Sequence, residues 1–359
     1  MRILSAGTAL PGPAIDTGAL ARRFGMDGIW EQWVDAFIGT RTRHLAIDLE
    51  SGQPRQSLAD LGETAARAAL DRAGLSAQDV DVMVLGTATP DQLMPATVNV
   101  IADRLRIDDI PTFQLQSGCS GAVQTFDVAA ALLRTGRYRT ALVIGGDVIA
   151  KHYDVTADLG ALPPGELVNY VLFGDGAGAA VLSTLDRPEA PALRAVVTRL
   201  SGLDRTPGQV LNWYGQADRS TAQVAPAHED YKAIEEWVPL LAEQAVEDLL
   251  DELGWEREEV DYLLPPQLSV TMTRRITERL DFADAVEVSR VADTGNTGNA
   301  LLFFQLEQLL ADMAAPSRAV AVAVESSKWI RAGLALERGT GPGGDERSER
   351  DKRDGGELI

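Results

Sequence analysis

The chain repeats one pattern of residues half its length further on. The segment ALDRAGLSAQDVDVMVLG (69–86) aligns without gaps on LLDELGWEREEVDYLLPP (249–266), and the two share Leu, Asp, Gly and a Val-Asp pair. Each copy predicts a helix, a glycine stop, a short loop and a strand. A single recurrence favours two similar halves, because a solenoid needs three or more short repeats. We therefore expect a body with approximate twofold symmetry.

Strand and helix patterns alternate around these copies. Residues 57–75 carry a Ser57 cap, Asp60 three positions later, apolar residues at helical spacing and a glycine at the end. VDVMVLG (80–86) and ALVIGG (141–146) are short, continuous apolar runs. Such strands, placed between amphipathic helices, indicate a sheet covered on both faces. The sequence therefore predicts an α/β fold.

Composition excludes several classes of protein. The 359 residues are 45% hydrophobic and 24% charged, with a formal net charge of -20. This acidity argues against nucleic acid or an anionic membrane as a partner. The start is too short for a secretory signal, and no apolar run reaches the roughly 18 residues needed to span a bilayer. A single cysteine excludes an internal disulfide and fits a reducing compartment, so we expect a cytoplasmic protein.

The single cysteine, Cys119, lies in QLQSGCSGAVQTF, where a strand pattern turns into a helix pattern. Unpaired N–H groups at a helix start favour an anion, so we expect the thiol pKa to fall from about 8.5 toward neutrality, making a nucleophile. The alternative is an inert, small apolar residue. Local chemistry leaves both open. The repeat offset maps Cys119 onto Asn299, another helix start, and the two starts are expected to face each other at the centre.

Three motifs then give a resemblance. SGCSGAVQTFDVAAALLRTGRYRTALVIGGDV, FGDGAGAAVL (173–182) and DTGNTGNA (293–300) resemble, in order and spacing, the β-ketoacyl-acyl-carrier-protein synthase III family of the thiolase fold. GDGAGA is followed by a strand pattern, which speaks against a dinucleotide site. The resemblance implies a thiolase-like, five-layered α/β/α/β/α fold of two pseudo-symmetric halves, and a homodimer. We expect residues 1–185 to form the half with the nucleophile, 186–338 the other half, and 339–359 a disordered tail.

The resemblance also assigns roles to individual residues. Cys119 matches the acyl-accepting cysteine and Asn296 the family's asparagine. Trp33 matches a tryptophan that packs on the adenine of coenzyme A, and Lys151 a basic residue opposite it; helix packing and a solvated charge are the alternatives. The implied acyl donor is a phosphopantetheine thioester of coenzyme A or acyl carrier protein, with no bound cofactor and no metal.

One departure from the family pattern limits the chemistry. Pro266 stands where the family has a histidine that, with asparagine, donates hydrogen bonds to the enolate formed by decarboxylation. Losing one such donor costs about 3 kcal/mol of transition-state stabilisation, so two-carbon chain extension is disfavoured. Another base must replace the imidazole, and His152 is better placed for it than His44 or His228. Gln267 has the donors to orient a substrate but is not a base.

These observations favour an acyltransferase of secondary metabolism, as in antibiotic and polyketide pathways. It would load an acyl group onto Cys119 and transfer it to an alcohol, an amine or a carbon nucleophile. Met94 and the segment 154–169 are expected to shape its pocket, and backbone donors near Ser327 and Lys328 to assist the acyl oxygen. The alternatives are a decarboxylative starter-unit β-ketoacyl synthase and a non-catalytic scaffold or dimer partner.

Overall fold

The computed structural model describes residues 1–212 and 227–340, so most of the expected tail lies outside the described residues. Its strands form two half-sheets of identical topology. The first follows the order β1-β7-β6-β4-β5 and the second β8-β14-β13-β11-β12. In each, the two pairs nearest the shared edge are antiparallel and the two pairs farthest from it are parallel. Numbered within its own half, each sheet therefore reads 1-5-4-2-3, and the predicted pseudo-symmetry is confirmed.

The two half-sheets meet through one residue pair, Arg2 and Ala192, between β1 and β8. The strands of the first half-sheet are β1 (Arg2–Ala9), β4 (Val82–Thr87), β5 (Thr112–Gln116), β6 (Thr140–Asp147) and β7 (Gly176–Ser183). Those of the second are β8 (Ala192–Leu200), β11 (Tyr262–Leu264), β12 (Val286–Glu287), β13 (Ser317–Glu325) and β14 (Ile330–Arg338). A boundary near residue 185 stays a proposal.

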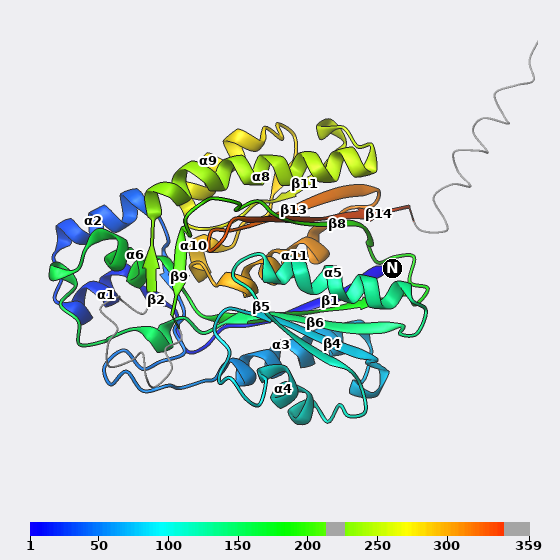
Figure 1. The fold of residues 1–359 in the computed structure, drawn as a ribbon, viewed down its shortest axis with the longest axis horizontal. Helices are drawn as coiled ribbons and strands as arrows, with labels where there is room; N and C mark the ends of the chain where they lie inside the picture. Colours follow the sequence, from blue (N-terminus) through cyan, green and yellow to red (C-terminus); the bar gives the residue numbers. More distant parts are fainter. Residues whose placement is uncertain (213–226, 341–359) are drawn as a thin grey trace, which may run out of the picture.

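Helices lie in three layers around the two half-sheets (Figure 1). The outer layer on the first half-sheet contains α3 (Leu58–Ala73) and α4 (Thr97–Leu105), and the one on the second contains α8 (Tyr231–Leu253) and α9 (Val270–Leu280). Between the sheets lie α5 (Gly121–Arg134) and α11 (Leu301–Asp312). The expected α/β/α/β/α arrangement of the thiolase fold is thereby confirmed.

The repeated segments adopt the same local structure. Helix α3 ends at Gly74 with φ 65° and α8 at Gly254 with φ 64°, a left-handed conformation that glycine adopts without steric cost. A short 3-10 turn follows each glycine, η1 (Ala77–Asp79) and η4 (Arg257–Glu259), before β4 and β11 begin. The Ser57–Asp60 capping box predicted for α3 is also present.

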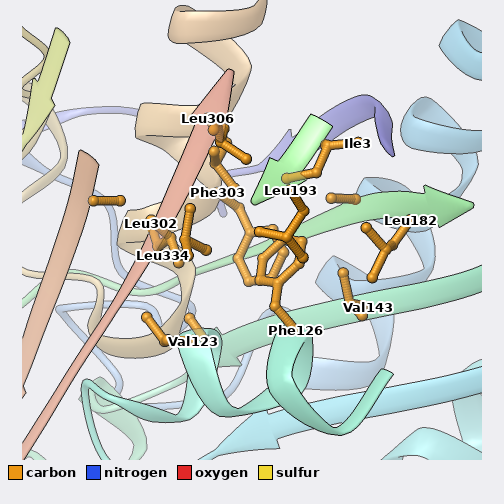
Figure 2. Packing of buried hydrophobic residues seen from close by; sticks show 14 of the residues in the cluster. Ile3, Val123, Phe126, Val143, Leu182, Leu193, Leu302, Phe303, Leu306 and Leu334 are labelled. Carbon is orange, nitrogen blue, oxygen red and sulfur yellow. The ribbon is translucent and has the colours of Figure 1, made fainter. Parts of the chain in front are cut away.

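The centre of the molecule is a close contact between α5 and α11. Phe126 of α5 and Phe303 of α11 are fully buried and stack with ring centroids 5.7 Å apart (Figure 2). A Cβ on Gly178 of β7 would lie 2.2 Å from the Cβ of Phe303. The glycines of GDGAGA therefore permit tight packing, as expected, and the chain continues into β7 rather than into a helix.

A smaller group of elements covers one end of this body, at the left of Figure 1. It comprises β2 (Ile15–Asp16), α1 (Thr17–Phe24), α2 (Gly28–Phe37), β3 (Thr42–Arg43), η2 (Ala150–His152), η3 (Leu159–Ala161), α6 (Pro164–Leu172), β9 (Gln209–Leu211) and β10 (Ala227–Glu229). The short elements α10 (Val291–Thr294) and η5 (Gly298–Ala300) precede α11. No helix among the described residues is both long and apolar enough to cross a bilayer.

Candidate active site

Cys119 lies at the elbow between β5 and α5. The residues around it are small because other chain segments approach closely: a Cβ on Gly118 would lie 3.1 Å from the carboxyl carbon of Glu325, and one on Gly121 would lie 2.4 Å from Asn299 Oδ1. Cys119 itself is half-buried. The elbow therefore lies in a crowded site that admits only small flanking residues.

The two helix starts face each other, as the repeat predicted. Asn299 Nδ2 donates to the Ser117 carbonyl at 3.0 Å and to Asp147 Oδ2 at 2.8 Å, and the Asn299 N–H donates to the same carboxylate oxygen at 2.8 Å. Asp147, at the end of β6, is buried and also accepts hydrogen bonds from the Thr87–Thr89 segment. This network fixes the position of the elbow.

Two adjoining cavities reach Cys119. The larger, of about 350 Å³, is also lined by Asp147, His152, Tyr153 and Glu325. The smaller, of about 20 Å³, is lined by Asn296 among others. The sequence-predicted pair, Cys119 and Asn296, thus shares one cavity wall. Their catalytic roles stay proposals.

Asn296 is held by its backbone and by one side-chain atom. Its N–H donates to the Leu172 carbonyl at 2.9 Å, and its Oδ1 accepts from the Gly298 N–H at 3.0 Å. Within residues 1–212 and 227–340, Asn296 Nδ2 donates to no protein acceptor. This amide is therefore available to donate a hydrogen bond to a ligand in the cavity.

The expected depression of the Cys119 pKa is wrong for this structure. Burial raises the pKa of Cys119 to about 12, and the negative charges of Glu325, Asp147 and Glu229 add to the effect. Helix α5 begins only at Gly121, so the thiol precedes the first turn, where the helix dipole acts most strongly. The resting group is a thiol, and any reaction through its thiolate requires a base.

Alkylation of the thiol should report this raised pKa. Because the thiolate is the reactive form, the rate with iodoacetamide is expected to rise about tenfold per pH unit between about pH 7 and about pH 10, without levelling off. Intact-protein mass spectrometry over time measures the rate, and Cys119→Ala provides the unlabelled control. A plateau below about pH 8 would contradict the raised pKa.

The structure separates the three histidines. His152 of η2 lines the larger cavity, and burial, with the charge of Lys151, lowers its imidazole pKa, which favours the neutral form. The Nδ1 of His44 lies 3.1 Å from the Pro11 carbonyl and 3.2 Å from the Gly12 carbonyl, and this residue lines neither cavity. The side chain of His228 lies outside the described residues. His152 is therefore the described imidazole nearest to the site.

Neither Pro266 nor Gln267 lines the two cavities at Cys119. The Gln267 amide is occupied, since its Nε2 donates to the Val288 carbonyl and its Oε1 accepts from the N–H groups of Arg290 and Val291. The substrate-orienting role considered for Gln267 is therefore wrong: the side chain braces the loop before α10.

The two residues expected to bind the carrier arm lie outside both cavities. Trp33 of α2 packs in the apolar cluster of α1, α2 and α6, with its ring 6.0 Å from that of Phe37. Lys151 Nζ donates to the carbonyls of Thr89 and Pro90, each at 2.7 Å. Their role in binding coenzyme A or a carrier protein stays a proposal.

Other parts of the chain also shape the pocket. Glu166 and Asn169, from the expected segment 154–169, line the larger cavity, whereas Met94 is 85% exposed and does not. Ser327 lies in this cavity wall, in the turn between β13 and β14. No cluster of three or more His, Cys, Asp or Glu able to hold a metal occurs among residues 1–212 and 227–340.

Sequence reasoning missed the buried carboxylates. Asp147 and Glu325 each end a long apolar strand, and a charged residue at such a position is a signal that could have found them. Glu229 ends the three-residue strand β10, where no local pattern marks it. Only the tertiary structure places it beside Cys119.

Comparisons with known proteins agree with this arrangement. The model for 3-oxoacyl-[acyl-carrier-protein] synthase III matches residues 113–199, and the model for the C-terminal part of that family matches residues 250–325. The β-ketoacyl-[acyl-carrier-protein] synthase III of Neisseria meningitidis serogroup C (strain 053442) is 27% identical over 308 residues, which cover 85% of this chain and 89% of the relative.

Solved structures extend the match over nearly the whole chain. AbyA1, a tetronic acid condensing enzyme, is 60% identical with a TM-score of 0.90, covering 94% of this chain and 99% of that one. The 3-oxoacyl-(acyl carrier protein) synthase III of Pseudomonas aeruginosa PAO1 is 26% identical with a TM-score of 0.81, covering 94% and 98%. With a shared fold, matching motifs and an elbow cysteine, this chain belongs to the 3-oxoacyl-[acyl-carrier-protein] synthase III family.

Proposed function

We propose that this protein is a condensing acyltransferase that loads an acyl group onto Cys119 and joins it to a second substrate in a tetronic-acid-type ring, without decarboxylation. The proposal depends on one observation, namely that Cys119 and Asn296 line the same cavity. Pro266 lines neither of the two cavities at Cys119. The 60% identity to a tetronic acid condensing enzyme supports the ring-forming chemistry.

The first half-reaction is acyl loading. The sulfur of Cys119 bonds to the carbonyl carbon of the donor thioester, and the donor's thiol leaves with the proton that Cys119 gave up. The Asn296 amide and backbone N–H groups at the elbow and near Ser327 are the donors proposed for the negative charge on the carbonyl oxygen. No redox step and no metal are needed.

The second half-reaction follows from the bonds of the ring. A tetronic acid contains one ester bond and one new carbon–carbon bond. A hydroxyl of the second substrate bonds to the acyl carbon, and Cys119 leaves as a thiol. The carbon between the two carbonyls of a β-ketoacyl group, which is acidic, attacks the thioester carbon of the second substrate, whose thiol leaves with that proton. No carbon dioxide is released, so the histidine missing at Pro266 is not required.

The donor in this proposal is a phosphopantetheine thioester of acyl carrier protein or coenzyme A. Both deliver the same reactive group. The acceptor is a small hydroxyacyl thioester, and the wider role is in antibiotic or polyketide biosynthesis. We further propose a cytoplasmic homodimer, as the family resemblance suggests.

The test combines two measurements on the intact protein. A β-ketoacyl thioester alone should add one acyl mass to the protein. Adding a 2-hydroxyacyl thioester should release a product whose mass equals both acyl parts joined, with loss of both thiols. Malonyl thioester, the control, should yield no carbon dioxide above background. Decarboxylation coupled to extension would instead identify a starter-unit synthase, and no adduct with any donor would indicate a scaffold.

A further inference from the structure

Glu229 is a buried carboxylic acid with one unoccupied oxygen. It ends β10, which pairs with β9, and only 6% of the residue is exposed. Gln209 Nε2 donates to Oε1, whereas Oε2 is buried and has no hydrogen-bond partner within the described residues. Because a buried carboxylate without a partner is costly, such an atom calls for an explanation in terms of chemistry or a ligand.

The free oxygen belongs to a residue that lines the same cavity as the nucleophile. Glu229, Cys119 and Asn296 all line the cavity of about 20 Å³. This volume holds about one water molecule, so a proton can pass between the two side chains directly or through a single water. Phe173 and Gln209 line both this cavity and the larger one, which places Glu229 next to the space proposed for the substrates.

The two other carboxylates whose charges act on Cys119, those of Glu325 and Asp147, are occupied by hydrogen bonds. Glu325 Oε2 accepts from the hydroxyls of Ser117 at 2.7 Å and Ser120 at 2.6 Å, and its Oε1 accepts from Ser327. Asp147 accepts hydrogen bonds at both oxygens from Asn299 and from the Thr87–Thr89 segment. A carboxylate held in this way is a poor proton acceptor, because its lone pairs are already used.

The proton affinity of Glu229 suits a base at neutral pH. Burial raises the pKa of Glu229 to about 7, although the hydrogen bond from Gln209 opposes the shift. A general base works best when its pKa lies near the operating pH. The thiol, by contrast, stays protonated at rest and needs such a partner.

We propose that Glu229 is the general base of this active site and replaces the imidazole that Pro266 removes. The inference rests on the proposed function in one respect, namely that Cys119 is acylated. During loading, Glu229 Oε2 takes the Cys119 proton as the sulfur–carbon bond forms, and then gives it to the departing donor thiolate. During transfer, it takes the proton of the attacking hydroxyl and returns it to the Cys119 sulfur. It then takes the proton of the attacking carbon and gives it to the departing thiolate of the second substrate.

The experiment compares acyl loading with alkylation in Glu229→Gln. Glutamine keeps the shape and the Gln209 contact but accepts no proton. Loading from a β-ketoacyl thioester, followed by intact mass, is expected to slow by about 100-fold or more. Alkylation by iodoacetamide, which needs only the thiolate, is expected to be at least as fast as in wild type, because a charge that raises the Cys119 pKa is gone. Glu236→Gln, on the exposed face of α8, is the matched control.

Each result of this experiment either supports or contradicts the role of Glu229 as the general base. If Glu229→Gln loads the acyl group at a rate within about threefold of the wild type, the proposal is wrong. If the rates of loading and alkylation fall by the same factor, the role of Glu229 is structural, and the proposal is also wrong. Loss of loading in His152→Asn but not in Glu229→Gln would assign the proton to the imidazole. If Glu229→Gln does not fold, Glu229→Asp carries the test, and unchanged loading there contradicts the role. Failure of wild type to load any thioester would instead reject the proposed function.

Discussion

Replacing Cys119 by alanine is expected to abolish the acyl adduct and to lower turnover by about 10⁴-fold or more. A covalent mechanism has no alternative route when its nucleophile is removed, and what remains comes from binding and oxyanion stabilisation alone. Because Cys119 is the single cysteine of the chain, no other thiol can accept the group. The measurement is intact mass after incubation with a β-ketoacyl thioester, together with product formation over time.

The same variant has an internal control. Cys119 is half-buried, and the change removes only one sulfur atom, so the folded state should persist. A thermal transition like that of the wild type establishes this. An adduct of acyl mass on folded Cys119→Ala would show that another residue is the acyl acceptor, and the mechanism proposed above would then be incorrect.

Replacing Phe303 by alanine is expected to lower the free energy of unfolding by about 3 to 5 kcal/mol. The ring is fully buried between the half-sheets and stacks on Phe126, so its removal leaves a cavity that the rigid strands cannot fill. Gly178 of β7 lies against the Cβ of Phe303, and Gly145 of β6 lies against its ring. Each of these strands is hydrogen-bonded to a neighbouring strand on both sides. Equilibrium unfolding in urea, analysed at constant protein concentration, gives the difference.

Phe37→Ala provides the matched control. Its side chain is of the same type but is 60% exposed on α2, and its loss should cost less than about 1 kcal/mol. If Phe303→Ala does not fold, Phe303→Leu should still destabilise the protein by more than Phe37→Ala does. Equal effects at the two positions would show that the contact between α5 and α11 contributes little to stability.

Local patterns were enough to predict an α/β body of two similar halves, whereas the five-layered order was implied by the family resemblance. The repeat around Gly74 and Gly254 reappears as two helix ends with nearly equal backbone angles, each followed by a turn and a strand. Helix capping, glycine stops and apolar strands are short-range effects, so they can be recognised without knowledge of the partners. The close approach of the two helix starts, in which Asn299 contacts Gly121 and donates to the Ser117 carbonyl, followed from the same symmetry.

Electrostatics at the site could not be predicted in this way. The turn into α5 suggested a thiol of low pKa, but the actual sign depends on carboxylates contributed by β6, β10 and β13. These strands are distant in sequence and meet only in the folded chain. Lys151 gives a second example, because carbonyls of another segment accept its hydrogen bonds. A pKa is a property of the surroundings, and the surroundings are tertiary.

The sequence by itself determined the twofold plan and the elbow that carries Cys119, because each depends on residue type and on neighbours along the chain. The tertiary structure alone decided which groups share a cavity with the sulfur. It placed the buried acid Glu229 there and tied up the Gln267 amide elsewhere. The physical reason is that burial and charge act through space, so chain segments far apart in sequence set the proton affinity of this site.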